Sequence, residues 1–297
     1  MDKEILAGEV AAKVAAALRK KEDENDHLKN VLQAFGKLRI EQARWKALLP
    51  VRNGSDITLL DPEKFSEGVP LADRERLICL GDLWRTAAER LIPPMAEGFP
   101  KVSRELAWLE TAIRNSTFHP DLFLGAHFGG RDEEARGIAA ELGLEVEFVL
   151  FALHQMAKPV VENCAASILP MVGELAWNRG YCPICGSFPE MSLLREKEGQ
   201  RWLLCSFCGT TWRFSRTSCP FCDTQGPEHR ERFFVEGREH EAAEVCHKCG
   251  KYLTSIDLRN MADQIVQEIM DISLMHLDVV ALQKGFLPMK GIGWASA

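Results

Sequence analysis

The sequence predicts a multidomain α plus small β fold: an N-terminal all-helical domain, two tandem four-cysteine modules and a C-terminal helix. Three observations lead to this prediction. Apolar residues recur at helical spacing through the first part of the chain, four Cys-x-x-Cys pairs crowd into residues 182–249, and a further helical stripe follows them. The expected boundaries are 1–178, 179–215, 216–258 and 259–297.

The first part of the chain carries apolar patterns that place one face of a helix against a core. Two stripes show this spacing: Leu6, Val10, Val14 and Leu18, and then Val102, Leu106, Leu109 and Ile113. Helix breakers fall at 50–54, 93–94, 98–100 and 117–130. We therefore expect roughly six to eight helices that share one core, large enough to fold without metal.

The cysteines are concentrated in the second part of the chain. Eight of the ten form Cys-x-x-Cys pairs: Cys182–Cys185, Cys205–Cys208, Cys219–Cys222 and Cys246–Cys249. The two-residue gap lets both sulfurs of a pair face one metal ion, and a four-thiolate cage needs two such pairs. The count therefore predicts two metal sites.

The residues between the pairs indicate which pairs belong together. The strand-like runs 190–194 and 201–204 flank a turn at 198–200, and the runs 231–235 and 242–245 flank a turn at 236–237. The region is thus an internal repeat of two units, each a cysteine pair, a hairpin and a cysteine pair. We expect sequential pairing: Cys182, Cys185, Cys205 and Cys208 at the first metal, and Cys219, Cys222, Cys246 and Cys249 at the second. An interleaved arrangement that joins the first and third pairs is the alternative.

The residue after each second cysteine suits a tight turn around the metal. Gly186, Gly209 and Gly250 adopt left-handed backbone conformations at low cost, and Asp223 tolerates them better than most residues do. His247 lies between the cysteines of the last pair. We expect it to be exposed and not a ligand, because four cysteines already complete the cage.

The remaining cysteines and the C-terminal segment have structural interpretations. Cys79 and Cys164 lie in apolar helical patterns and are expected to be small buried residues. A helix is expected from Asn260, which can cap it, with an apolar stripe at Met261, Ile265, Ile269 and Ile272. We expect this stripe, with the tail after it, to pack back on the N-terminal helices.

Charge and hydropathy limit the location and the partners. Residues 2–4 are charged, and the N-terminal segment does not resemble a secretory signal. The most apolar stretch, residues 148–172, is interrupted by charged residues and proline. We therefore expect a cytoplasmic protein with no stable membrane insertion, where paired cysteines bind metal more often than they form disulfides.

The paired cysteines leave three classes of function open. A zinc-ribbon nucleic-acid-binding protein is one, but the net charge is −7, and residues 180–260 hold 11 basic and 11 acidic residues without a basic stripe. A thiol oxidoreductase is another, but it needs one cysteine pair at a helix start, not four pairs in turns. The third is a metal-bearing module that serves structure or electron transfer.

The residues around the cysteines resemble a known family. The matching segments are Tyr181-Cys-Pro-Ile-Cys-Gly-Ser-Phe-Pro189, Leu204-Cys-Ser-Phe-Cys-Gly-Thr-Thr-Trp212, Arg216-Thr-Ser-Cys-Pro-Phe-Cys222 and Cys246-His-Lys-Cys249, with Leu277-Asp278 and Gly285-Phe286 further on. They resemble the FdhE family of formate dehydrogenase accessory proteins.

The resemblance implies a function that the spacing alone does not. It implies that the two modules are rubredoxin-like, each with one metal ion held by the eight paired cysteines. Iron is the favoured occupant, and zinc fits the same cage. It also implies a cytoplasmic accessory protein, not itself a catalyst, that binds the formate dehydrogenase catalytic subunit and is required for its activity. The four-cysteine modules then either dock that subunit or deliver an electron to it.

Overall fold

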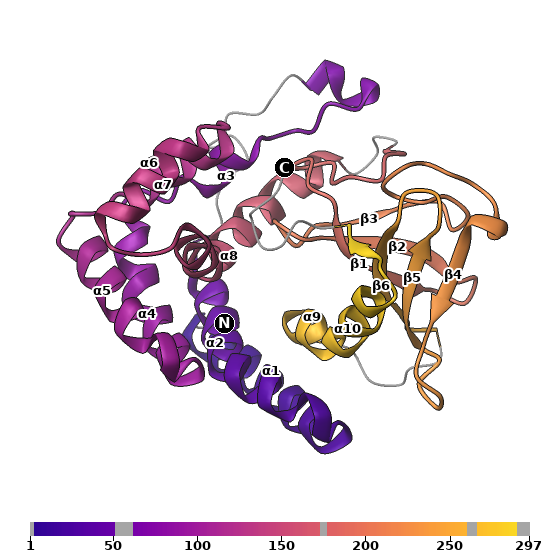
Figure 1. Cartoon of the computed structure of the whole chain (residues 1–297), viewed down its shortest axis with the longest axis horizontal. Coiled ribbons are helices and arrows are strands. Elements are labelled where there is room, and N and C mark those ends of the chain that lie inside the picture. Colours follow the sequence, from indigo (N-terminus) through magenta and orange to yellow (C-terminus); the bar gives the residue numbers. More distant parts are fainter. Residues whose placement is uncertain (1–2, 51–61, 173–176, 260–265, 290–297) are drawn as a thin grey trace. The chain divides into compact units, whose positions relative to one another are not determined.

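The computed structural model describes residues 3–50, 62–172, 177–259 and 266–289 (Figure 1). These residues divide into two compact units. The helical unit contains residues 3–50 and Arg74–Cys164, and the sheet unit contains residues 62–73, the end of the last long helix and everything after it. Each unit is described by itself below.

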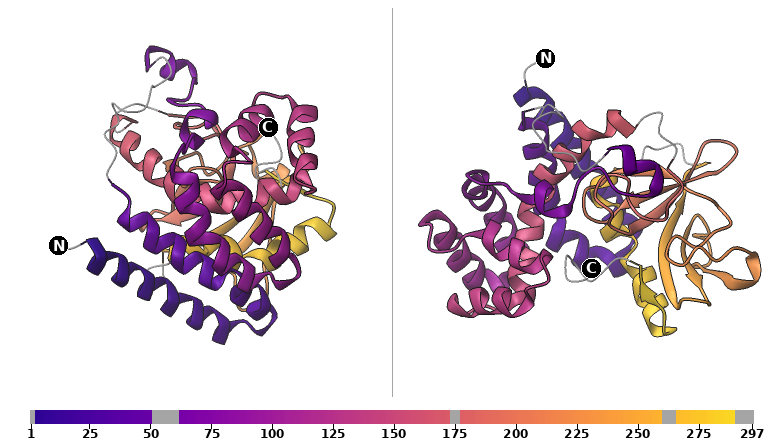
Figure 2. Two further views of the ribbon diagram at one scale, coloured as in Figure 1. Left: turned by 90° about the vertical axis from the view of Figure 1, so that its left-hand side faces the viewer. Right: turned by 90° about the horizontal axis from the view of Figure 1, so that it is seen from above.

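The helical unit confirms the all-helical prediction for the first part of the chain. Its helices are α1 (Lys3–Glu24), α2 (Lys29–Leu48), α3 (Arg74–Ile78), α4 (Leu83–Gly98), α5 (Ser103–Arg114), α6 (Pro120–Phe128), α7 (Asp132–Glu141) and α8 (Val146–Val172). Helix α1 packs on α2, α2 on α4, α4 on α5 and α6 on α7 (Figure 2). None of the helices among the described residues combines the length and hydropathy needed to cross a membrane.

The helical core follows the predicted stripes in part. Val14, Leu18, Leu106, Leu109 and Ile113 are buried, whereas Leu6 is exposed and its neighbour Ala7 is buried instead. The stripe of α1 is therefore shifted by one residue at its start. Buried Cys164 confirms its assignment as a core residue, but Cys79 is exposed, because it follows the last residue of α3 and leaves the apolar face.

Two expected helix breaks are wrong. Pro93 and Pro94 lie inside α4, where burial of Leu91, Ile92 and Met95 favours continuation of the helix over the local cost of proline. The segment expected as a break at 117–130 contains α6. Proline occupies the first helical position of α6, where its fixed φ suits a helix and its missing N–H costs nothing.

Helices α2 and α4 approach each other closely at Gly98. A Cβ atom at this position would lie 1.8 Å from the backbone oxygen of Ala34. We therefore predict that Gly98→Ala destabilises the helical unit by about 1–3 kcal/mol, because the two backbones must separate. Gly137→Ala in α7 is the control, since nothing lies within 4 Å of its Cβ and alanine favours the helix. Urea unfolding followed by far-UV circular dichroism measures both, and equal midpoints for the two variants would contradict the close approach.

A buried carboxylate joins α2 to α8. Glu162 lies 2.6 Å from Nζ of Lys46 and 2.7 Å from Nζ of Lys158. Burial by itself raises the pKa of Glu162, but the two ammonium groups outweigh this effect and lower the pKa to about 2.

The lowered pKa makes the stability of the helical unit dependent on pH. Since the pKa falls from 4.5 to about 2 on folding, the carboxylate adds about 3 kcal/mol. This contribution is fully present above pH 4.5 and is lost as the pH falls through 2. Urea unfolding between pH 7 and pH 2.5 should show a shallower acid loss for Glu162→Gln than for the unchanged protein; parallel curves would refute the prediction.

The sheet unit contains one continuous sheet. Its strands are β1 (Pro189–Arg195), β2 (Gln200–Cys205), β3 (Thr211–Arg213), β4 (Arg230–Phe233), β5 (Glu241–Cys246), β6 (Lys251–Asp257) and β7 (Leu287–Pro288). The order is β3-β2-β1-β6-β5-β4, with β7 paired to β6. Hairpins β1–β2 and β4–β5 confirm the two predicted hairpins and the internal repeat.

The two modules are joined edge to edge, not merely placed in tandem. Strand β1 of the first module pairs in parallel with β6 of the second, from Met191↔Thr254 to Leu194↔Asp257. Strand β7 pairs in parallel with the beginning of β6, where Leu287 and Pro288 lie opposite Lys251 and Tyr252. The expected boundary at residue 215 therefore separates strands that belong to one sheet. The four expected domains remain a prediction.

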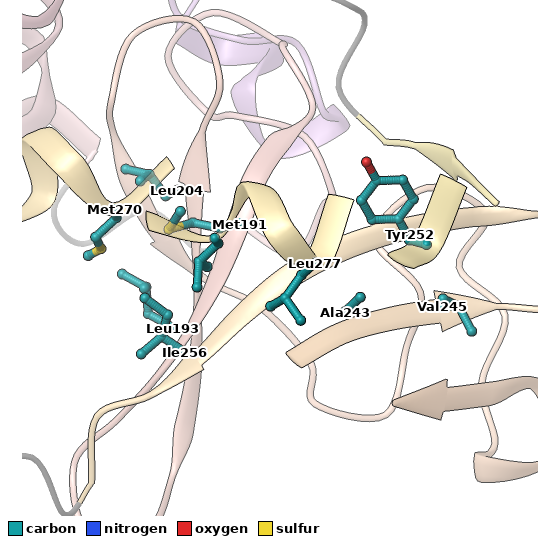
Figure 3. Packing of buried hydrophobic residues seen from close by; sticks show 11 residues of the cluster. Met191, Leu193, Leu204, Ala243, Val245, Tyr252, Ile256, Met270 and Leu277 are labelled. Carbon is teal, nitrogen blue, oxygen red and sulfur yellow. The ribbon is translucent and has the colours of Figure 1, made fainter. Parts of the chain in front are cut away.

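Helices α9 (Met270–Ser273) and α10 (Met275–Gln283) cover an apolar face of the sheet. The buried cluster contains Met191, Leu193, Leu204, Ala243, Val245, Tyr252 and Ile256 from the strands, with Met270, Leu274, Leu277 and Ala281 from the helices (Figure 3). The Tyr252 hydroxyl also donates a hydrogen bond to Asp278 at 2.8 Å.

The apolar face of the shared sheet is the partner of Met270, Leu274, Leu277 and Ala281. Ile269 and Ile272 of the expected stripe are buried, whereas Asn260, Met261 and Ile265 lie outside the described residues. The return of this stripe to the N-terminal helices stays a prediction. A sheet of joined modules exposes a wider apolar face than two separate ribbons would, and a helix must cover it.

Candidate metal centre

Each cysteine pair lies in a turn that closes on its own backbone. The N–H groups of Gly186, Asp223 and Gly250 donate to the carbonyl oxygens of the first cysteines of their pairs at 2.9–3.0 Å. All four residues after the second cysteines have positive φ, namely 73°, 67°, 55° and 68° for Gly186, Gly209, Asp223 and Gly250. This confirms the turn conformation predicted from the sequence.

The first cluster contains Cys182, Cys185, Cys205 and Cys208. The Sγ atoms of Cys182 and Cys208 are 3.6 Å apart, and those of Cys185 and Cys205 are 3.4 Å apart. All four cysteines are buried. The hairpin β1–β2 brings the two pairs together, because one pair precedes β1 and the other begins at the end of β2.

The second cluster contains Cys219, Cys222, Cys246 and Cys249. The Sγ atoms of Cys219 and Cys249 are 3.8 Å apart, and those of Cys222 and Cys246 are 3.7 Å apart. The hairpin β4–β5, whose connecting loop is longer than that of β1–β2, brings these two cysteine pairs together in the same way. Both groups confirm sequential pairing over the interleaved alternative, while the ligation of metal by these residues stays a prediction.

The sulfur positions fit a tetrahedral metal ion. With metal–sulfur bonds of about 2.3 Å, the sulfurs of a four-thiolate site lie about 3.8 Å apart, close to the distances in both clusters. Backbone N–H groups stabilise the negative charge of the thiolates. That of Ile184 lies 3.4 Å from Sγ of Cys182, and that of Phe207 lies 3.4 Å from Sγ of Cys205. The two four-cysteine groups could therefore bind metal ions.

The ionisation of the thiols also calls for a cation. Burial of a thiol raises its pKa, but hydrogen bonds with neighbouring groups outweigh it at Cys185, whose pKa lies well below its usual value, and at Cys222, whose pKa is lowered to about 7. Burial prevails at Cys182, whose pKa lies well above its usual value, and at Cys219, whose pKa is raised to about 11. Such thiols stay protonated at neutral pH unless a nearby positive charge stabilises the thiolate. A divalent metal supplies that charge and displaces the protons.

Hydroxyl groups take equivalent places in the two clusters. Oγ1 of Thr210 lies 3.2 Å from Sγ of Cys208, and Oγ1 of Thr224 lies 3.2 Å from Sγ of Cys222. Each threonine is two residues beyond the second cysteine of its pair, and each carbonyl accepts a hydrogen bond from the N–H of the first cysteine at 2.9 Å. The sequence analysis missed this repeat, which a Cys-x-x-Cys-x-Thr pattern would have revealed.

A segment distant in sequence covers the first cluster. Residues 65–72, called the strap here, begin in the second half of the 3₁₀ helix Pro62–Glu67 and run past the first cysteine turn. The backbone N–H groups of Leu71 and Ala72 donate to the carbonyl oxygens of Pro183 and Ile184 at 2.9 and 2.7 Å. The Tyr181 hydroxyl donates to the carbonyl oxygen of Gly68 at 2.7 Å.

A buried ion-pair network joins the two modules. Nη2 of Arg201 on β2 lies 2.8 Å from Oε2 of Glu244 on β5, and Nη2 of Arg230 on β4 lies 2.9 Å from the same oxygen. Arg201 also donates to the carbonyl oxygen of Ser218, directly before Cys219, at 3.1 Å. Burial raises the pKa of Glu244, but the two guanidinium groups lower it below its usual range.

Close backbone packing reinforces this connection. A Cβ atom on Gly180 would lie 1.8 Å from the backbone oxygen of Pro220, so the first and third cysteine turns approach with no room for a side chain. The buried Trp212 donates from its indole N–H to the carbonyl oxygen of Arg179 at 3.1 Å, which places its ring beside the first turn. His247 is exposed and bonded to Glu231, outside both clusters, as expected.

Three comparisons with known proteins each find similarity to FdhE proteins. Residues 181–216 match the family model "FdhE, central domain". The chain is 29% identical to the FdhE homolog of Aquifex aeolicus over 153 residues, which cover 50% of this chain and 53% of that relative. It is 32% identical to Protein FdhE of Escherichia coli O127:H6 over 117 residues, 38% of this chain and 37% of the relative. These matches span about half or less of the curated relatives.

The fold has a close match among solved structures. The crystal structure of the FdhE protein from Pseudomonas aeruginosa aligns with 96% of this chain and 95% of its own, with a TM-score of 0.64 and 19% sequence identity. At this identity the match shows the fold, which extends over both units.

Proposed function

We propose, from the chain's similarity to FdhE proteins, that it is a non-catalytic accessory protein required for the maturation of formate dehydrogenase. It binds the catalytic subunit of that enzyme in the cytoplasm through its two rubredoxin-like modules. The single observation that carries the proposal is the pair of four-cysteine clusters on one sheet. The first of these clusters lies within residues 181–216, the segment that matches the family model.

The cysteines are proposed to hold one metal ion in each cluster, with iron as the occupant. Iron in a four-thiolate site supplies one-electron chemistry. The protein's own contribution is to fix the four sulfurs, to direct N–H groups such as that of Ile184 at them, and to bury Cys182 and Cys205 away from water. Hydrogen bonds to the sulfurs and exclusion of water both tune the redox role that we propose.

Exposed apolar side chains support docking through the sheet unit. Phe221 in the third cysteine turn, Phe234 and Val235 after β4, and Leu287 in β7 are all exposed. Large apolar groups on a protein surface often mark a protein interface. The catalytic subunit is the partner that we propose to cover them.

Co-purification without oxygen tests the binding proposal. A tagged form of this chain should retain the catalytic subunit of formate dehydrogenase, and Phe221→Ser with Phe234→Ser should weaken retention at least tenfold. Cys79→Ser is the control, because Cys79 lies outside both clusters. No retention by the unchanged chain would refute the proposal, and nucleic-acid binding that weakens steeply with salt would favour the zinc-ribbon alternative.

Metal analysis tests the redox proposal separately. Protein purified without oxygen should contain about two iron ions per chain and turn red in air, as the ferrous sites of four thiolates oxidise. The colour should bleach on reduction with dithionite. Colourless protein with two zinc ions would remove the redox role and leave the modules as scaffolding.

A further inference from the structure

The two cysteine clusters differ in their access to solvent. All four cysteines of the first cluster are buried, whereas Cys222 and Cys249 of the second are partly exposed. Their partners Cys219 and Cys246 are buried. Each pair of the second cluster therefore contributes one buried and one partly exposed cysteine.

The first cluster is closed by its own turns and by the strap. Pro183, Ile184 and Phe207, which lie between the cysteines of its two pairs, are buried. Two strap N–H groups are bonded to the carbonyl oxygens of Pro183 and Ile184. A Cβ atom on Gly186, directly after Cys185, would lie 3.1 Å from Cγ of Pro70 in the strap. A small molecule must displace the strap or a turn before it reaches a sulfur here.

Among the described residues, the turns of the second cluster carry exposed side chains where those of the first are buried. Phe221, His247 and Lys248, between the cysteines of its two pairs, are exposed. Strand β7 does attach beside the fourth turn, where the N–H of Leu287 donates to the carbonyl oxygen of Gly250 at 2.9 Å. The Leu287 side chain nevertheless points into solvent, and Cys222 and Cys249 stay partly exposed.

We infer that the second cluster is an exchange site for soft metal ions and thiol ligands, with Cys222 and Cys249 as its reactive edge, and that the first cluster is closed. Replacement of a thiolate ligand requires an incoming ligand to approach a sulfur, so access sets its rate. A cluster with four buried sulfurs exchanges only after local unfolding. The inference rests on the proposed metal binding by the eight cysteines.

Release of metal to a chelator tests this inference on the full chain. Protein reconstituted with two zinc ions is mixed with 4-(2-pyridylazo)resorcinol, and absorbance follows the transfer. We expect one zinc ion per chain to leave at least tenfold faster than the other. Iodoacetamide labelling read by mass spectrometry should then reach Cys222 and Cys249 before any cysteine of the first cluster. A single rate for both ions, or earlier labelling of the first cluster, would overturn the inference.

Variants of the strap and of the reactive edge sharpen the test. Ala72→Pro removes the N–H that bonds to Ile184 and should accelerate the slow release, whereas Ala72→Gly keeps that N–H and should leave the slow release within about twofold. Cys222→Ser should remove the fast phase alone. Protein that never holds two zinc ions contradicts the proposed metal binding, whereas two ions with one common rate contradict only the exchange site.

Discussion

Cys205→Ser is expected to abolish metal binding at the first cluster and to unfold the part of the sheet around it. Cys205 ends β2 and is one of the four cysteines proposed to bind the first metal ion. Structural zinc contributes about 10–16 kcal/mol to the folding of small metal modules, more than a typical domain's whole stability. The loss should therefore extend through β1 to β6, because these strands pair directly.

Metal content and hydrogen exchange measure this result together. The variant should hold one metal ion per chain instead of two, and amide protection should disappear from β1–β3 while the helical unit keeps its protection. Cys79→Ser is the matched control, as the same substitution at an exposed cysteine outside the clusters. Full protection of β1–β3 in a variant with one metal ion would show that the first cluster does not stabilise the sheet.

Glu244→Gln is expected to destabilise the sheet unit by about 3–5 kcal/mol. The substitution leaves the buried guanidinium of Arg201 without its carboxylate, and an uncompensated buried charge is costly. Arg230 loses the same partner. The network connects β2 with β4 and β5, so its loss should weaken the connection between the modules.

Chemical denaturation of the metal-loaded protein measures this effect, with two comparisons. Glu236→Gln removes an exposed carboxylate and should change the unfolding free energy by less than about 0.5 kcal/mol. The double variant Arg201→Met with Glu244→Leu removes both buried charges and should recover most of the lost stability, since an apolar pair has no charge to desolvate. A Glu244→Gln variant as stable as Glu236→Gln would mean that water already solvates Arg201.

The sequence predicted the features that depend on local spacing. The gap within each cysteine pair, the glycine or aspartate after it and the hairpin between pairs all act within about 30 residues. They were sufficient for the two clusters, for the turn conformation and for the exposure of His247. Helical periodicity likewise predicted the character of the first part of the chain.

The features that the sequence did not predict depend on distant partners. The parallel pairing of β1 with β6 joins residues about 60 positions apart, and neither strand carries a pattern that specifies its neighbour. Arg201 is the one charged residue of β2, and Glu244 shares β5 with Glu241, so neither charge identifies its partner from the sequence. The helix break expected at Pro93 and Pro94 was wrong for a related reason. The burial of side chains around them in α4 outweighs the preference of proline to end a helix.

The strap has a consequence for the order in which the chain assembles. The hydrogen bond between Tyr181 and Gly68 closes a loop of 113 residues, whereas the four cysteines of the second cluster lie within residues 219–249. Closing a long loop costs more entropy and takes longer than closing a short one. The second cluster can thus assemble as soon as its module is synthesised, but the first turn receives its cover only after a segment made much earlier has returned to it.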